Sequence, residues 1–155
     1  MIIDLLQLRQ KGKESESFTF TYQLPEGLLS IPDSAFTGPA EIECLVEVYP
    51  DEAFISGKCR YQLAGPCSRC LEDTVYQGEV LFDERFLPAA REGEADCDLF
   101  VYERDRINLT RFIDELILTD MPLSLLCNED CKGLCHDCGQ NLNKGDCGHH
   151  RRNND

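Results

Sequence analysis

Strict alternation of apolar and polar residues predicts the first strand of the chain, over residues 17–24. The apolar positions of this run are Phe18, Phe20, Tyr22 and Leu24. Successive side chains of a strand point to opposite faces, so the run indicates a strand with one buried face. We expect residues 1–24 to contribute one or two strands in total.

Two further alternating runs lie between residues 40 and 64, and the polar turn Pro50-Asp51-Glu52 joins them. Two such runs around a short turn are typical of an antiparallel hairpin. A third run follows at 74–82, so residues 40–83 are predicted to form a three-stranded meander. Together with the first strand, this meander is sufficient for a twisted antiparallel sheet or a small, partly open barrel.

A single apolar stripe with helical spacing follows the strands. It consists of Leu109, Phe112, Ile113, Leu116 and Ile117. Spacings of three and four residues place these side chains on one face of an amphipathic helix. Asn108 is suited to cap its start, and Pro122 requires it to end by Asp120 or Met121. We therefore predict an α+β fold with one packed helix, a body over residues 1–125 and a cysteine-rich tail over 126–150.

The charge of the chain is strongly negative. Its 155 residues include 15 Lys and Arg against 29 Asp and Glu, which gives a formal net charge of −14. Residues 72–105 hold eleven of the acids and three of the bases, and 91–98 is predicted to be an exposed loop. This balance argues against a protein whose whole surface binds nucleic acid, and it favours a basic partner.

Ten cysteines form the second unusual feature of the composition. A chain of this length can bury a core without disulfides. The N-terminal residues lack the basic region of an export signal, and no apolar run has the length of a membrane span. We therefore expect a cytoplasmic protein without membrane contact, in which clustered thiols indicate metal or redox chemistry.

Half of the cysteines lie in the polar tail, where no apolar run could build a core. They are Cys127, Cys131, Cys135, Cys138 and Cys147. A zinc ion can order such a segment, and Cys135-x-x-Cys138-Gly139 has the form of a zinc knuckle. We predict a Zn²⁺ site formed by four of the five tail cysteines, with His149 as a possible substitute ligand.

The Cys67-Ser-Arg-Cys70 motif between two predicted strands leaves three interpretations open. It has ligand spacing, although Leu71 follows it in place of glycine. It could pair with Cys135 and Cys138 in a two-knuckle ribbon that pins the tail to the sheet. It could also be a redox pair, although such a pair belongs at a helix N-terminus, or a tight turn with two reduced thiols.

The other three cysteines are not predicted to be ligands. Cys44 and Cys59 fall in phase with the apolar faces of their strands, so we expect them to be small buried hydrophobic residues. Cys97 lies in the acidic run, where carboxylates disfavour its thiolate. No nucleophile elbow, phosphate-binding loop or His-Glu-x-x-His motif is present, so we predict neither an enzyme nor a small-molecule substrate.

The two cysteine motifs together resemble the YceD family, the large ribosomal RNA subunit accumulation proteins. The resemblance rests on Cys67-Ser-Arg-Cys70-Leu-Glu and on the tail Cys127…Cys131-Lys-Gly-Leu-Cys135-x-x-Cys138-Gly-x-Asn-Leu-Asn…Cys147, and covers residues 40–150. This chain differs from the family pattern in having His136 where proline is usual and Cys147-Gly-His149 where Cys-x-Cys is usual. The resemblance implies a cytoplasmic protein that supports accumulation or processing of the large-subunit ribosomal RNA.

Our leading hypothesis is thus a non-catalytic factor for assembly of the large ribosomal subunit, acting through a basic ribosomal protein or through pre-rRNA. Any direct RNA contact is expected from local bases: Lys58, Arg60, Arg69, Lys132, Lys144, Arg151 and Arg152. A thiol redox or zinc-switch protein is the first alternative. A general protein-interaction module with a purely structural zinc is the second.

Overall fold

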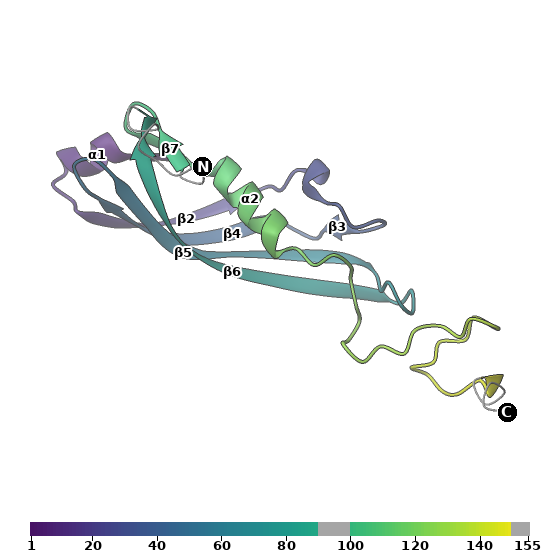
Figure 1. The fold of residues 1–155 in the computed structure, drawn as a ribbon. Helices are drawn as coiled ribbons and strands as arrows, with labels where there is room; N and C mark the ends of the chain where they lie inside the picture. Colours follow the sequence, from purple (N-terminus) through teal and green to yellow (C-terminus); the bar gives the residue numbers. More distant parts are fainter. Residues whose placement is uncertain (90–99, 150–155) are drawn as a thin grey trace.

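The computed structural model describes residues 1–89 and 100–149 of the chain. The elements are β1 (Ile2–Asp4), α1 (Leu5–Gln10), β2 (Ser15–Tyr22), a 3₁₀ turn (Glu26–Leu28), β3 (Ala35–Phe36), β4 (Ala40–Val48), β5 (Ala53–Pro66), β6 (Asp73–Pro88), β7 (Phe100–Tyr102), β8 (Arg106–Asn108) and α2 (Thr110–Asp120). Among the described residues, six strands form one sheet in the order β2-β4-β5-β6-β7, with β3 paired to β5. The sheet is long and bent, and α2 lies across one face of it (Figure 1).

The predicted meander is confirmed and is longer than its sequence pattern suggested. β4 pairs antiparallel with β5, and β5 pairs antiparallel with β6 from Ala53↔Phe86 to Pro66↔Asp73. β6 continues beyond the predicted end at residue 82 to Pro88, and Phe86 in this extension is buried in the core. At the opposite end of these strands, the β5–β6 hairpin projects past the rest of the sheet and ends in the Cys67-x-x-Cys70 turn (Figure 1).

The α+β prediction is confirmed, and the strands of the described residues do not close into a barrel. One pairing differs from a purely antiparallel sheet, since β7 joins β6 in parallel through Phe86↔Phe100 to Pro88↔Tyr102. The predictions of an exposed loop at 91–98 and of an unreactive Cys97 lie outside the described residues.

The N-terminal segment holds a second helix that was not predicted. Residues 1–24 contribute β1 and β2, and the short helix α1 lies between them. Asp4 caps α1 by accepting a hydrogen bond from the Gln7 amide (3.1 Å), and Leu5 and Leu8 are buried. A helix of six residues is too short to show an apolar period.

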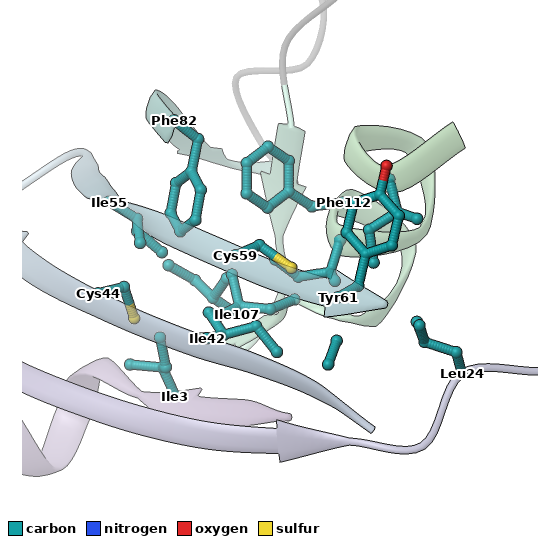
Figure 2. Close-up of a cluster of buried hydrophobic side chains, with 14 of the residues drawn as sticks. Ile3, Leu24, Ile42, Cys44, Ile55, Cys59, Tyr61, Phe82, Ile107 and Phe112 are labelled. Carbon is teal, nitrogen blue, oxygen red and sulfur yellow. The ribbon is translucent and has the colours of Figure 1, made fainter. Parts of the chain in front are cut away.

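Helix α2 matches its prediction, and it is held to the sheet by aromatic packing and by two polar contacts. The Asn108 side chain accepts a hydrogen bond from the Thr110 amide (3.0 Å) at the start of the helix, and the helix ends at Asp120. The Tyr61 hydroxyl of β5 donates to Asp120 (2.8 Å), and the Tyr22 hydroxyl of β2 donates to Asp114 (3.0 Å). Figure 2 shows Tyr61 and Phe112 in the layer between sheet and helix, where the Phe112 ring packs against Phe82 with 5.2 Å between ring centroids.

The core between sheet and helix contains Cys44 and Cys59, as predicted. Both side chains are buried among isoleucine and aromatic side chains (Figure 2). Burial raises the pKa of the Cys44 thiol to about 11 and that of Cys59 to about 12. These two thiols therefore behave as small hydrophobic groups, because their nucleophilic thiolate forms are strongly disfavoured.

Candidate metal centre

The tip of the β5–β6 hairpin and the segment after α2 bring four cysteines together. Cys67 and Cys70 come from the hairpin turn, and Cys127 and Cys131 come from the start of the tail. All four sulfur atoms lie within 4.8 Å of one another, although about 60 residues separate the two pairs in sequence. We call this group cluster I.

The sulfur spacing of cluster I fits a tetrahedral zinc site. The Sγ atoms of Cys67 and Cys131 are 3.8 Å apart, and those of Cys70 and Cys127 are 3.6 Å apart. A tetrahedron with Zn–S bonds of about 2.3 Å has edges of about 3.8 Å. The donor set of four thiols is also the set that structural zinc sites prefer.

Backbone and side-chain amides around cluster I favour the thiolate form of two of its sulfurs. Burial opposes a thiolate at Cys67, but the amides of Cys127, Arg69 and Cys70 donate toward its sulfur and lower its pKa to about 6. The Asn143 side-chain amide donates to the Cys131 sulfur (3.2 Å) and lowers its pKa, despite an opposing effect of burial. The Cys127 pKa rises to about 12, first because of Cys131 beside it. Four thiolates at this spacing therefore need a cation.

The turn after Cys70 has knuckle geometry in spite of its sequence. Leu71 has a φ of +60°, the left-handed conformation that glycine usually supplies at this position of a knuckle. Its amide donates to the carbonyl of Cys67 (2.9 Å), and the Cys67 amide donates to the carbonyl of Glu72 (2.8 Å). Leucine in place of glycine therefore costs free energy in this left-handed conformation, but the turn still forms.

A second group of ligand atoms, cluster II, lies entirely within the tail. It consists of Cys135, Cys138, Cys147 and His149, whose ligand atoms lie within 4.8 Å of one another. Gly139 has a φ of +73°, as expected for a knuckle, and its amide donates to the carbonyl of Cys135 (2.8 Å). The Cys138 amide, directed at the Cys135 sulfur, lowers the pKa of that thiol although burial opposes the shift.

The imidazole of His149 supplies an independent sign of a ligand in cluster II. Its Nδ1 atom is buried and has no hydrogen-bond partner among the described residues. Such a buried nitrogen is unfavourable unless it is paired, and a metal ion would pair it. Three thiols and one imidazole are a common set for a closed structural zinc site.

The structure divides the predicted ligands between two groups. Of the five tail cysteines, Cys127 and Cys131 belong to cluster I, whereas the other three belong to cluster II. Cys67 and Cys70 lie beside Cys127 and Cys131, and not beside the Cys135 knuckle. A third group of Cys135, His136 and Asp137 shares a ligand with cluster II. Binding of metal at all of these residues stays a prediction.

Few contacts other than the cysteines connect the tail to the body. The Leu134 amide donates to the carbonyl of Arg69 (3.1 Å), and the Arg69 guanidinium donates to the carbonyls of Glu129 (3.0 Å) and Cys131 (3.1 Å). The Lys144 ammonium forms an ion pair with Glu72 (2.6 Å), and the Asn141 side-chain amide donates to the same carboxylate (3.3 Å). Cys67, Cys70 and Cys131 form a small buried cluster, with Leu134 packed against it, that is separate from the main core.

Most of the predicted RNA-contacting bases already have partners. Lys58 pairs with Glu43 (3.1 Å), and Arg60 pairs with Glu79 (2.5 Å) on the open face of the sheet. Arg69 and Lys144 are engaged at the tail, as described above. Among the described residues, Lys132 is the candidate whose ammonium group has no ion pair, and 151–152 lie outside them. A continuous basic surface for RNA is therefore not formed by these residues.

Comparison with known proteins places these clusters in a family. The model described as "Large ribosomal RNA subunit accumulation protein YceD" matches residues 55–155, which include every ligand of clusters I and II. The chain belongs to the YceD family. The family is named for accumulation of a ribosomal RNA subunit and not for a reaction, which connects it with the ribosome.

Several similar proteins match different shares of the chain. "Uncharacterized protein YlbN" of Bacillus subtilis is 25% identical over 126 residues, which are 81% of this chain and 73% of that protein. "Large ribosomal RNA subunit accumulation protein YCED homolog 1, chloroplastic" of Zea mays is 36% identical over 75 residues, 45% of this chain and 26% of the maize protein. "Uncharacterized protein Rv2926c" of Mycobacterium tuberculosis is 26% identical over 102 residues, covering 64% of this chain and 49% of that protein. No solved structure matches the chain. No helix in the described parts of the chain is long and apolar enough to cross a membrane.

Proposed function

We propose that this protein is a non-catalytic cytoplasmic factor that supports assembly of the large ribosomal subunit and accumulation or processing of 23S rRNA. The observation that carries the proposal is membership of the YceD family over residues 55–155. The maize relative, whose name gives accumulation of the large ribosomal RNA subunit, supports it. The ligand clusters support a structural role, because each offers four protein ligands and no open position for a substrate.

In this proposal, clusters I and II each hold a zinc ion. Thiolate and imidazole ligands in tetrahedral sets favour zinc over magnesium or calcium, which prefer oxygen ligands. The ion in cluster I would join the hairpin turn to the tail, and the ion in cluster II would fold the tail itself. The zinc ions therefore supply the order that the few apolar contacts of the tail do not.

The partner that we propose is a basic ribosomal protein, with pre-rRNA contact confined to isolated bases. The formal charge of −14 counts thiols as neutral. A zinc ion with four thiolates adds two further negative charges, and one with three thiolates and an imidazole adds one. A surface of this charge attracts a basic polypeptide and repels a phosphate backbone.

Depletion of the protein tests the proposal. We expect precursors of the large-subunit RNA to accumulate or mature 23S rRNA to fall, and we expect a tagged chain to recover large-subunit precursors. Unchanged rRNA together with no recovered ribosomal component would refute the role. A tagged Cys67→Ser variant serves as the matched test of the metal, since it should recover fewer precursors at equal abundance.

A thiol switch is the second candidate function, and the spacing of cluster I supports it. The Cys67–Cys131 and Cys70–Cys127 sulfur pairs are near enough to form disulfides after small side-chain rotations. With hydrogen peroxide as oxidant, two thiols would lose two protons and two electrons to give one disulfide and two waters, with release of the metal. Zinc that is retained at peroxide doses sufficient to oxidise free cysteine would exclude the switch.

A further inference from the structure

The outer edge of β6 is a long strand edge without a strand partner in the described parts of the chain. β6 pairs with β5 along fourteen registered positions, Asp73 to Phe86. On its other side, its pairing with other described residues is limited to β7 over 86–88. The border of the sheet along the hairpin is therefore open over residues 73–85 (Figure 1).

The direction of the backbone groups along this edge follows from the registers. The Gln62 carbonyl accepts a hydrogen bond from the Thr37 amide (3.1 Å), so Gln62 directs its backbone groups away from β6. Gln62 lies opposite Gln77 in an unbroken antiparallel register. Gln77 is thus in a non-hydrogen-bonded pair, and its own amide and carbonyl point to the open edge. The same holds for every second residue of β6 from 75 to 85.

The side chains of these outward positions lie on the solvent face of the sheet and have a distinct pattern. Val75 and Leu81 are apolar and exposed, Leu81 to 74%. Glu79 and Asp83 are acidic and lie on either side of Leu81 along the strand. Asp83 has no ion pair with any described residue, whereas Glu79 has one with Arg60. The edge therefore presents an acidic, apolar, acidic sequence at alternate positions.

This pattern selects among the molecules that could occupy the edge. A second copy of the chain would place like charges opposite each other, on molecules that already carry −14 each. An RNA backbone would meet the same acids. An extended polypeptide with basic, apolar and basic residues at alternate positions matches the edge in both hydrogen bonding and charge.

We propose that the outer edge of β6 binds a basic, extended segment of a partner protein by strand addition. The segment would pair with the outward backbone groups of Val75 to Asp83, with basic side chains opposite Glu79 and Asp83 and an apolar side chain opposite Leu81. This inference deepens the proposed function, on which it rests for the basic protein partner, by assigning the surface and the mode of binding.

Hydrogen exchange with a peptide probe tests the mode of binding. The probe is a capped peptide of about ten residues. Lysine, valine and lysine occupy three successive alternate positions, so they lie on one face of the extended peptide, and threonine occupies the positions between them. Strand addition should protect the amides of alternate residues, among them Gln77, Glu79 and Leu81. The intervening amides of β6 already bond to β5 and should not change. Binding without this alternation, or no binding, would overturn the proposal.

Two proline variants provide a matched comparison. Gln77→Pro removes an outward amide of β6, and Thr19→Pro removes an outward amide of β2, the opposite edge of the sheet. Neither amide bonds within the sheet, so thermal unfolding should confirm that both variants fold. We expect Gln77→Pro to weaken binding of the peptide about tenfold or more and Thr19→Pro to change it less than about twofold. Equal effects would contradict a site on β6.

A charge reversal keeps the proposal testable if Gln77→Pro does not fold. Asp83→Lys should weaken the lysine peptide about tenfold and should strengthen binding of the same peptide with glutamate in place of lysine. A peptide of equal charge whose backbone amides are N-methylated at alternate positions lacks the donors that strand addition needs, so it should not bind the wild-type protein. Binding of this peptide would refute strand addition. Because these measurements use no ribosomes, their failure leaves the ribosomal role intact. Loss of that role in the depletion experiment would leave the peptide result standing.

Discussion

Replacing Cys70 by serine removes one thiolate from cluster I and tests whether a metal holds the tail to the sheet. Cys70 comes from the hairpin turn, and its sulfur lies 3.6 Å from that of Cys127 in the tail. We expect this variant to bind one zinc ion per chain where the wild-type protein binds two. Cluster II should retain its ion because all of its ligands lie within the tail.

The size of the effect on the tail follows from comparing the contacts that would be left without the metal with the free-energy cost of ordering the tail. Three hydrogen bonds at Arg69 and one from Asn141 to Glu72 contribute about 1 kcal/mol each, and the exposed pair between Lys144 and Glu72 contributes at most about 1 kcal/mol. Ordering the roughly ten residues from 127 to 135 costs about 1–2 kcal/mol per residue. These contacts fall short of that cost by about two- to fourfold, whereas a structural zinc ion contributes about 10–16 kcal/mol. The tail should therefore detach in the variant.

Limited trypsin digestion reads out this detachment. Cys70→Ser should expose the peptide bond after Lys132 to rapid cleavage. Cys138→Ser, which removes a ligand of cluster II, should expose the bond after Lys144 and leave Lys132 protected. Cys44→Ala is the control, because Cys44 lies in the main core away from both clusters. Equal resistance of Lys132 in the wild-type protein and in Cys70→Ser would refute the role of the metal.

The body should be insensitive to the same change. The cysteines of cluster I pack outside the main core, so thermal unfolding of the body in Cys70→Ser should stay within about 0.5 kcal/mol of the wild-type value. Cooperative loss of the body together with the tail would show that the two parts do not order separately.

Other predictions concern single positions. Gly78→Ala would place a Cβ 2.3 Å from the Tyr61 ring, so denaturant unfolding should show a loss of about 1–3 kcal/mol, and an unchanged midpoint would contradict the packing. Tyr61→Phe should cost about 1.5–3 kcal/mol through the lost bond to Asp120. Burial and then this bond raise the pKa of Tyr61, so folding favours its protonated form. The difference in free energy of unfolding between the wild-type protein and Tyr61→Phe should therefore shrink as the pH rises above about 10. A difference that stays constant with pH would refute the pKa shift. Leu71→Gly should relieve about 1 kcal/mol of left-handed strain and slow zinc loss to a chelator, whereas faster loss would contradict it. His149→Ala should release one zinc ion in metal analysis and His149→Cys should retain it, whereas two ions in His149→Ala would exclude this ligand.

The strands and the main helix were predictable because their patterns are local. The alternation of apolar and polar residues predicted the β4–β5–β6 meander, and the apolar stripe that follows Asn108 predicted α2. Helix α1 has too few residues to show a period, and the parallel pairing of β7 depends on a contact that no local pattern encodes.

The candidate site was predictable in its parts but not in its assembly. The spacing of each cysteine pair identified possible ligands. The meeting of Cys67 and Cys70 with Cys127 and Cys131 depends on where α2 returns the chain along the sheet, which spacing cannot indicate. Leu71 illustrates a second limit. Its side chain argued against knuckle geometry, yet the turn adopts a φ of +60° at that residue.

Native mass spectrometry of the protein, purified without chelator, tests the central claim most directly. The account predicts a mass equal to that of the chain with two zinc ions and with all cysteines reduced. It also predicts one ion in Cys70→Ser and one in Cys138→Ser. A metal-free chain whose tail still resists trypsin would contradict the account, because the tail would then be ordered without the ions assigned to it.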